Sequence, residues 1–477
     1  MNHNVPDPST PISKALALCE PTHSQERRIA TVAQEAKGLV DNYVERLDDV
    51  VDVVFGGSFA KGTWLPDHAD IDIFVRIKPS VRIEKFEELG REIGSKALKN
   101  YGPKLRYSDH PYVEVFVKKV RVNVVPCYDV EQGKWQSAAD RSPFHTQYVS
   151  SHFNDEKKTQ ARLLKKFFKS AGIYGAEIST EGFSGYVSEV LVLKYSSFEG
   201  VLRAAADWQE RQIIAVCDYD SDFIKAFNSP VIIIDPVDSR RNLGSAISPQ
   251  SVAKFMLAAR AFLENPSLEF FKEGKYHHHH HHNRHRRRCK GASRKLLLPN
   301  VLVVEFSHEK KSPDIIWGQL KRSINAIAKQ LELAHFVVLR SSCVTDETSS
   351  AALAFLLESI TLPAYTKKKG PEVFRRKDTA SFLSNRKSKP LAIWVDREMR
   401  IAMLIDRNST DARKFVGSLL LNHHENSGVS KDLIVNKLQI YSGSDRKIIK
   451  GLAEEVISEV VSTERLIFRR GARHKVA

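Results

Sequence analysis

The stretch GGSFAKGTWLPDHADIDIFV, residues 56–75, decides the fold of the N-terminal part of this chain. A glycine–serine turn is followed at a fixed distance by two aspartates, Asp70 and Asp72, within an apolar run that includes Ile71. Because side chains at i and i+2 of a β-strand point to the same face, this pattern predicts a strand with one apolar and one acidic face. The carboxylates then lie roughly 6–7 Å apart along the chain, which lets them share divalent metal ions.

The turn before the aspartates, with Gly57 and Ser58, is expected to expose backbone N–H groups. Such groups hold phosphate oxygens at helix N-termini and in nests of successive N–H groups. A phosphate-binding turn next to paired carboxylates is typical of metal-dependent nucleotidyl transfer. A lone Asp-x-Asp is more often the exposed end of an ordinary strand. The Gly-Ser and Gly-Thr dipeptides at this spacing favour the catalytic interpretation.

Length and composition limit the classes of protein to which this chain can belong. At 477 residues the chain is too long for a single core, and we expect about two to four domains. The five cysteines are scattered without any Cys-x-x-Cys pair, which fits a reducing cytoplasm and argues against a zinc knuckle. No stretch is apolar enough for a membrane span, and the first residues have no signal-peptide pattern. We therefore expect a cytoplasmic protein with no membrane partner.

The net charge is strongly positive. Lys and Arg number 73 against 57 Asp and Glu, which gives a formal charge of +16. An enzyme of small anionic metabolites rarely needs such an excess, whereas a protein that follows a phosphate backbone does. A generally basic surface of solvated side chains is the alternative. The excess favours a nucleic acid as partner.

Hydrophobic periodicity in the first half predicts a small mixed α/β module followed by helices. Thr22 begins a capping box, so a helix should start there, and a second helix is expected at 83–98. Extended segments at 111–117 and 120–126 follow, joined by two lysines. From Asp155 the pattern becomes helical.

The second half alternates strand-like and helix-like segments. Strands are expected at 231–235, 301–306, 336–339, 390–395 and 401–405, and helices at 251–263, 316–333, 411–421 and from Arg446. This order is consistent with two small α+β modules, one of them built from discontinuous pieces. Six consecutive histidines at 277–282 have no metal-site geometry, because neighbouring residues do not converge on one ion. We interpret them as part of an exposed basic loop whose role, including contact with nucleic acid, stays open.

Several motifs, in the order in which one family carries them, make this chain resemble the archaeal, class I CCA-adding tRNA nucleotidyltransferases. They are GGSFAKGTWLPDHADIDIF (56–74), VVPCY (124–128), RSPFHTQYV (141–149), RLLKKF (162–167), GIYGAEI (172–178), GFSGY (182–186) and DPVDSRRN (235–242). The resemblance spans about residues 25–245, and weaker similarity continues to the C-terminus. Independent blocks in a fixed order are far more specific than any single motif.

The resemblance implies an α+β multidomain fold with a polymerase β-like nucleotidyltransferase head, a helical neck, and α+β body and tail domains that hold the tRNA acceptor arm. The corresponding domains are 1–140 (head), 141–228 (nucleotide-binding neck), 229–300 (first part of the body), 301–430 (α+β body and tail, tRNA-binding) and 431–477 (C-terminal helices returning to the body). The implied activity is template-independent addition of C, C and A to the tRNA 3′ end from CTP and ATP, with Mg²⁺ in a two-metal site. Because the family often forms dimers, a homodimer is a further expectation.

In the head, the resemblance assigns the metal carboxylates to Asp70 and Asp72. It assigns the nucleotide phosphates to Ser58, with Gly57 in the same turn, and to Lys61. Relatives usually carry arginine at the last of these positions. Lys61 would therefore act as a point charge and not as a planar fork.

In the neck, the resemblance assigns contacts with base, ribose and triphosphate to His145, Lys165 and Tyr174, and it places Arg241 near the base. Each has a simpler alternative. His145 would be a hydrogen-bonded core histidine, Lys165 a solvated lysine among others, and Tyr174 a packing residue between two turns.

One position departs from the family pattern. The third metal carboxylate belongs in the strand before VPCY, where this chain has Asn123. Asparagine offers one carbonyl oxygen but no negative charge and no base. If residues 118–119 form a two-residue hairpin turn, Glu114 lies directly opposite Asn123 on the same face of the sheet. Our hypothesis is that Glu114 supplies the missing carboxylate, and a register shift of one residue would exclude it.

Three functions follow from these observations. The first is an active CCA-adding nucleotidyltransferase, in which Asp70 and Asp72 hold Mg²⁺. The second is a catalytically impaired homologue that binds tRNA and nucleotide, because Asn123 replaces a carboxylate. The third is a nucleotidyltransferase with another acceptor, which the long basic C-terminal half makes less suitable for a small molecule.

Overall fold

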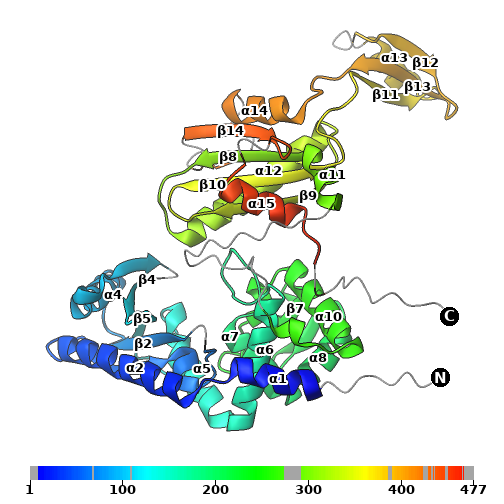
Figure 1. Cartoon of the computed structure of the whole chain (residues 1–477). Coiled ribbons are helices and arrows are strands. Elements are labelled where there is room, and N and C mark those ends of the chain that lie inside the picture. Colours follow the sequence, from blue (N-terminus) through cyan, green and yellow to red (C-terminus); the bar gives the residue numbers. More distant parts are fainter. Residues whose placement is uncertain are drawn as a thin grey trace, which may run out of the picture. The chain divides into compact units, whose positions relative to one another are not determined.

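The computed structural model describes residues 9–66, 69–107, 110–272, 292–384, 389–422, 428–430, 433, 436–445, 449–464 and 466. The chain divides into two compact units, one of residues 1–280 with 464–477 and one of residues 281–463 (Figure 1). Each has its own sheets and hydrophobic cores. Among the described helices none is both long and apolar enough to cross a membrane. The histidine tract at 277–282 lies outside the described residues.

The first unit contains a five-stranded mixed sheet in the order β1-β2-β5-β4-β3. Its strands are β1 (Val50–Gly56), β2 (Asp70–Ile77), β3 (Lys104–Tyr107), β4 (Pro111–Val117) and β5 (Val120–Tyr128). β2 and β5 are parallel, and the other neighbours are antiparallel. Helices α2 (His23–Val44) and α4 (Ile83–Ala97) bury their apolar stripes against one face, where Ile71 and Ile73 are fully buried. The other face carries Asp70 and Asp72 at the start of β2 and the buried Phe74 further along the strand.

Local signals of the sequence account for several element boundaries in this sheet. The capping box at Thr22 is present, so α2 begins at the next residue as predicted. Lys118 and Lys119 have φ values of 49° and 67°, which is the backbone of a two-residue type I′ hairpin turn. This turn sets the β4–β5 register and places Glu114 opposite Asn123. The predicted hairpin register is confirmed.

The rest of the first unit is mainly helical and surrounds a core rich in phenylalanine. Its helices are α1 (Ser9–Cys19), α3 (Gly57–Lys61), α5 (Arg141–His152), α6 (Asp155–Ser170), α7 (Gly185–Tyr195), α8 (Phe198–Ala206), α9 (Ser221–Lys225) and α10 (Pro249–Glu264), with the short 3-10 helices η1 (Lys99–Tyr101), η2 (Ala138–Asp140), η3 (Leu243–Ala246) and η4 (Leu268–Phe271). A parallel pair, β6 (Gln212–Ile214) and β7 (Val231–Ile233), lies among them. Phe167 packs against Phe198, Phe262 and Phe270, which holds α6 against α8, α10 and η4.

The second unit is built on an antiparallel four-stranded sheet in the order β14-β8-β10-β9. The strands are β8 (Val301–Ser307), β9 (Val338–Thr345), β10 (Ser350–Leu357) and β14 (Asn436–Ser442). Helices α12 (Pro313–Leu333) and α14 (Ala412–Asn422) cover one face, and α15 (Leu452–Val460) covers the other. Helix α11 (Ala292–Leu297) and the 3-10 helix η5 (Leu298–Asn300) lead into β8.

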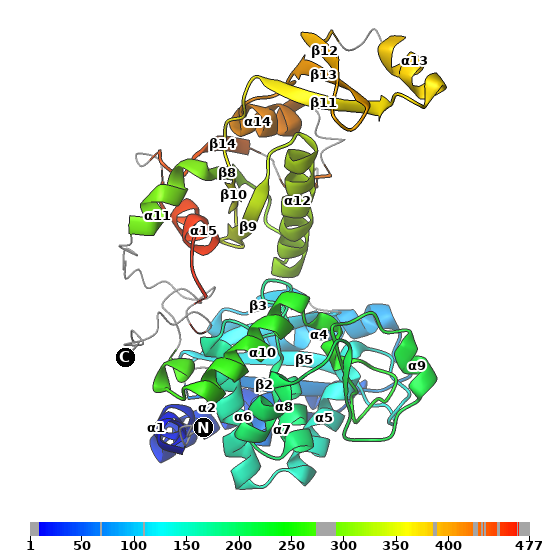
Figure 2. The same ribbon diagram turned by 90° about the vertical axis from the view of Figure 1, so that its right-hand side faces the viewer.

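A smaller three-stranded sheet, in the order β11-β13-β12, forms a separate end of the second unit together with α13 (Arg376–Ser384), as both views show (Figure 1, Figure 2). Its strands are β11 (Tyr365–Glu372), β12 (Ala392–Val395) and β13 (Arg400–Asp406). The α+β multidomain fold class is confirmed.

Some element predictions for the second half were wrong. The strand expected at 336–339 is β9, which runs to Thr345 with mostly half-exposed side chains and therefore lacks an apolar signal. The buried strand β10 was not predicted. The last described helix begins at Leu452, after Gly451 with φ of +63°. Arg446, where this helix was expected to begin, lies outside the described residues.

Candidate active site

The two aspartates of the opening motif lie on the open face of β2. Asp70 and Asp72 alternate with the fully buried Ile71 and Ile73, as the sequence predicts. Strand β5 places two further polar side chains beside them, because Asp70 pairs with Arg121 and Asp72 pairs with Asn123 in the parallel register. The predicted acidic face of the strand is therefore present.

The glycine–serine turn approaches this face closely. Gly57 begins helix α3 with φ of +63°, a backbone conformation that residues with a side chain rarely adopt. A Cβ atom placed on Gly57 would lie 1.9 Å from Oδ2 of Asp72, so a side chain at this position would collide with the carboxylate. Ser58 is the next residue of α3 and is partly exposed. The turn thus lies within reach of an ion or phosphate held at Asp72.

Both aspartates have nitrogen donors as partners. The guanidinium of Arg121 donates from Nη2 to Oδ2 of Asp70, and Nδ2 of Asn123 donates to Oδ1 of Asp72 at 2.8 Å. Burial raises the pKa of Asp72, and the Asn123 hydrogen bond opposes that shift. In the described part of the chain, no group of three or more His, Cys, Asp or Glu side chains could hold a metal. Two carboxylates and an amide stand where the family pattern has three carboxylates.

Glu114 lies on the same face as Asn123, as the predicted register requires. Its Oε1 accepts hydrogen bonds from Nη2 and Nε of Arg106 at 2.8 and 3.2 Å, and its Oε2 is 4.0 Å from Nη1 of Arg121. The carboxylate is buried and faces two guanidinium groups. Its role as a metal ligand stays a prediction, and neither arginine was identified from the sequence.

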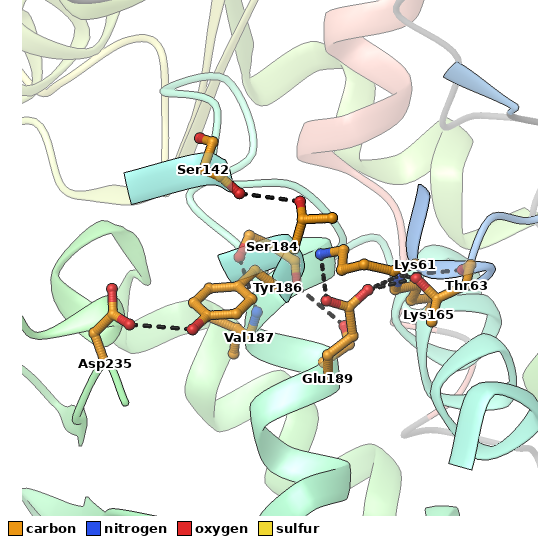
Figure 3. Close-up of polar contacts among 11 residues, drawn as sticks. Lys61, Thr63, Ser142, Lys165, Ser184, Tyr186, Val187, Glu189 and Asp235 are labelled. Atoms are coloured by element: carbon orange, nitrogen blue, oxygen red, sulfur yellow. Dashed lines mark hydrogen bonds and ion pairs between the residues drawn. The ribbon is translucent and has the colours of Figure 1, made fainter. Parts of the chain in front are cut away.

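Lys61 and Lys165, predicted from different motifs, meet at one carboxylate that the sequence analysis did not identify (Figure 3). Glu189 on α7 accepts from Nζ of Lys61 at 2.5 Å and from Nζ of Lys165 at 2.8 Å. The hydroxyl of Thr63 donates to the same carboxylate at 2.5 Å. Glu189 and Thr63 are fully buried, and the two lysines nearly so. We call these four residues the lysine cluster.

Electrostatics in the lysine cluster favour an anion. Burial lowers the pKa of Lys165 to about 8, although Glu189 opposes the shift. Burial would raise the pKa of Glu189, but the two lysines outweigh it and hold this pKa at about 2. At neutral pH Lys165 and Glu189 are therefore both charged, and Nζ of Lys61 contacts the same carboxylate. A signal for Glu189 existed in the sequence, because an acid within an apolar helical run needs a partner.

A second buried carboxylate, Asp235, organises the other predicted neck residues. Its Oδ2 is 2.9 Å from Nε2 of His145 and accepts from Nη1 of Arg241 at 3.2 Å, while its Oδ1 accepts from the hydroxyl of Tyr186 at 3.1 Å. His145 stacks on the Tyr186 ring with centroids 3.9 Å apart. Burial lowers the pKa of His145 and the hydrogen bond to Asp235 opposes it. The structure therefore brings His145 and Arg241 together through a residue that was only part of a quoted motif.

Tyr174 lies beside the lysine cluster. A Cβ atom on Gly185 would be 3.0 Å from the Tyr174 hydroxyl and 3.6 Å from Nζ of Lys165. The ammonium of Lys169 lies 5.3 Å from the centroid of the Tyr174 ring. Burial raises the pKa of the Tyr174 hydroxyl, which stays protonated at neutral pH. Its hydroxyl is a donor next to the cationic side chains.

Family models match three consecutive parts of the chain. A nucleotidyltransferase domain matches residues 39–149, the second domain of tRNA nucleotidyltransferase matches 159–272, and the C-terminal domain of the CCA-adding enzyme matches 299–443. The five-stranded sheet with its two aspartates thus belongs to the nucleotidyltransferase domain, and the lysine cluster links that domain to the second one.

Curated relatives match over most of their length. The CCA-adding enzyme of Methanothermobacter thermautotrophicus is 31% identical over 415 residues, which cover 86% of this chain and 88% of the relative. The CCA-adding enzyme of Pyrobaculum aerophilum is 38% identical, with coverage of 76% and 82%. The CCA-adding enzyme of Saccharolobus shibatae is 35% identical, with coverage of 84% and 89%. Among solved structures, the Cid1 poly(U) polymerase covers 55% of this chain and 98% of its own, at 14% identity and a TM-score of 0.44.

Two aspartates on one strand beside a glycine turn, and a cationic cluster joined to a second domain, are the arrangement that a nucleotidyl transfer needs. The identities over most of the chain assign the family directly. This chain belongs to the CCA-adding enzymes, a family of tRNA nucleotidyltransferases.

Proposed function

We propose that this enzyme adds C, C and A, one nucleotide at a time, to the 3′ end of tRNA from CTP and ATP, without a template and with Mg²⁺. The observation that carries the proposal is the meeting of Asp70 and Asp72 with the Gly57 turn on one face of the sheet. In each step the terminal 3′-hydroxyl oxygen forms a bond to the α-phosphorus of the nucleoside triphosphate and gives up its proton to solvent. The bond from that phosphorus to the bridging oxygen breaks, and pyrophosphate leaves.

The residues on the open face fit Mg²⁺, because they offer oxygen donors and the absence of a side chain at Gly57 lets the Asp72 carboxylate lie directly against the turn. Asp70 and Asp72 would hold the ion, and the Asn123 amide can turn its oxygen toward it, since amide orientation follows the hydrogen-bond partners. When bound, Mg²⁺ lowers the pKa of the attacking hydroxyl and neutralises charge that develops on the phosphate. Two such ions, as the family resemblance implies, would share the same pair of aspartates.

The other predicted residues are proposed to bind the nucleotide. Lys61 and Lys165 provide positive charge for the triphosphate, because Glu189 neutralises only one of them. Ser58 and the backbone of Gly57 provide hydrogen-bond donors for phosphate oxygens. The triphosphate is proposed to lie beside α3, because Gly57 of this helix lies against Asp72.

His145 and Arg241, joined through Asp235, are proposed to face the base, and Tyr174 to contact the ribose or the triphosphate. The Asp235 carboxylate restricts both side chains to one orientation, which suits the selection of C or A. We propose further that the second unit binds the acceptor arm of tRNA, and that the expected division into head, neck, body and tail follows the boundaries given above. A homodimer is part of the same proposal, and light scattering of the full chain in solution tests it.

Incorporation of labelled CTP and ATP into tRNA that ends at the base before CCA tests the function. We expect two cytidines from CTP alone, and one adenosine only after both cytidines are present. An unmodified chain that binds this tRNA but adds nothing at any Mg²⁺ concentration would instead identify a catalytically impaired homologue. Addition to other RNAs with equal efficiency would identify a different acceptor.

A further inference from the structure

The open face of the head sheet carries two arginines, Arg121 and Arg106, that the family assignments do not use. Across three neighbouring strands, Asp70 pairs with Arg121 and Arg121 pairs with Phe116. One row further, Asp72 pairs with Asn123 and Asn123 with Glu114. Arg121 therefore lies between the proposed metal ligands on β2 and the Glu114 carboxylate on β4.

Arg121 has two acidic neighbours, Asp70 and Glu114, which differ in their distance from it and in their exposure to solvent. It is hydrogen-bonded to Asp70, and its Nη1 lies 4.0 Å from Oε2 of Glu114. The side chains of Arg121 and Asp70 are 38% and 32% exposed, whereas that of Glu114 is only 8% exposed. Arg121 and Asp70 therefore lie at the solvent boundary, while Glu114 is enclosed by the protein.

Glu114 has an oxygen suited to receive Arg121. Its Oε1 is occupied by Arg106, which binds it with two nitrogen atoms. Its Oε2 faces Arg121 and has no shorter ion pair among the described residues. A guanidinium carries several N–H donors that point in different directions. A small rotation of Arg121 can therefore replace its hydrogen bond to Asp70 with one to Oε2 of Glu114.

We propose that Arg121 is a positioning residue that occupies Asp70 when no metal is bound and moves to Glu114 when a divalent cation binds Asp70. Asp70 cannot serve a guanidinium and a metal with the same oxygen, so the two compete. Glu114 favours the metal-bound arrangement because it offers the displaced guanidinium a partner. This inference rests on the proposed function, because it takes Asp70 as a metal ligand.

The proposal gives Glu114 a role that differs from direct metal binding. In both roles, Glu114→Gln weakens metal binding, so this variant alone does not separate them. The two roles differ once Arg121 is absent. If Glu114 acts only by receiving Arg121, its substitution has no effect in an Arg121→Gln background.

The experiment measures Mn²⁺ binding to the full chain without nucleotide, by the loss of the free-Mn²⁺ signal in electron paramagnetic resonance. We expect Arg121→Gln to tighten binding by about fivefold, the upper range for a partly exposed ion pair. Glu114→Gln should weaken it by about threefold on the same scale. The double variant should match Arg121→Gln alone. A weaker affinity in the double variant than in Arg121→Gln would overturn the proposal and support Glu114 as a ligand.

Arg106→Gln is the matched control, because it removes one guanidinium from the same face and leaves the Asp70 contact intact. Equal tightening of Mn²⁺ binding by both arginine variants would mean that the overall charge of this face, and not the Arg121–Asp70 contact, sets the affinity, and it would overturn the proposal. We expect the effect in Arg121→Gln alone. Circular dichroism melting of each variant confirms that the fold is retained.

Asp70→Asn separates failure of this inference from failure of the proposed function. Mn²⁺ binding that is lost in Asp70→Asn but unchanged in Arg121→Gln would overturn the positioning role and leave the metal site in place. Mn²⁺ binding that is insensitive to Asp70→Asn would overturn both.

Discussion

The carboxylate face of the head sheet and the lysine cluster use the same charged groups in opposite ways. On the sheet, Asp70 and its partner Arg121 are each about one third exposed. In the lysine cluster, Glu189, Lys61 and Lys165 are almost entirely buried, with Thr63 completing the hydrogen bonds. The first set of charges can exchange partners with ions from solvent. The second is fixed by the protein around it.

The difference in burial determines which of these ion pairs can be displaced by a ligand and which stabilise the fold. An exposed ion pair contributes little to stability and is easily displaced, which suits a site that must release and bind metal and pyrophosphate. A buried ion pair loses much more when one partner is removed, because an uncompensated charge remains in a poorly solvated place. The open face is therefore expected to control catalysis, and the lysine cluster to control both nucleotide binding and folding.

The largest effect is expected from Asp72→Asn. Loss of one of the two proposed metal carboxylates should reduce CTP incorporation by about 10³-fold or more, equivalent to ~4 kcal/mol of transition-state stabilisation. The melting temperature should change little, because burial already raises the pKa of this group and its charge does not stabilise the fold. A loss of less than tenfold in single-turnover rate would contradict the metal assignment.

Glu189→Gln should affect stability more than any substitution on the open face. It leaves Lys61 and Lys165 without their carboxylate, and we expect the free energy of unfolding to fall by about 3 kcal/mol. Urea denaturation measures the change. The double variant Glu189→Gln/Lys165→Met is the control, and it should recover part of the loss because it removes one of the stranded charges. No recovery would mean that packing, not charge, holds the cluster.

Asn123→Asp would restore the carboxylate of the family pattern and tests whether the open face lacks charge. We expect turnover with saturating CTP to rise by about tenfold, which corresponds to ~1.4 kcal/mol. The extra carboxylate lies beside Asp72, in the place where the amide now donates to it. Asn123→Ser, which adds no charge, serves as the control. An unchanged rate would mean that the chain already compensates for the asparagine.

The pH dependence should separate the two regions. Lys165 has a pKa of about 8, so it is charged below this pH and loses its proton above it. The value of kcat/KM for CTP should therefore fall above about pH 8, by several-fold at pH 9. Lys165→Arg keeps its charge and should move the decline to higher pH. Glu189→Gln removes a group that raises the Lys165 pKa, so the decline in kcat/KM should move to lower pH. Identical profiles for all three proteins would exclude Lys165 as the source.

The smallest effect concerns the hairpin that aligns the open face. Lys119 is exposed and has φ of +67°, which costs energy for any residue with a side chain. Lys119→Gly should raise the free energy of unfolding by ~0.5–1 kcal/mol without changing activity. Lys119→Ala, which keeps a Cβ atom, should show no comparable gain. Destabilisation by Lys119→Gly would mean that this side chain has a contact of its own.

The sequence by itself determined the local parts of the catalytic face. Alternation of Asp70 and Asp72 with buried residues, and a two-residue turn between β4 and β5, fixed which side chains share a face and that Glu114 lies opposite Asn123. These features depend on strand geometry, which repeats every two residues and can be read from neighbouring positions. The same motifs carried the family resemblance, which named Lys61, His145, Lys165 and Arg241.

Only the tertiary structure decided which carboxylates bind these predicted side chains. Glu189 binds Lys61 across 128 residues of sequence, and Asp235 binds His145 across 90. The partners of Arg121 and Arg106 depend on the strand order, which places Arg121 beside Asp70 and Arg106 beside Glu114. No periodicity encodes such distant pairs, because they arise when separately folding segments bury charges that must then find partners.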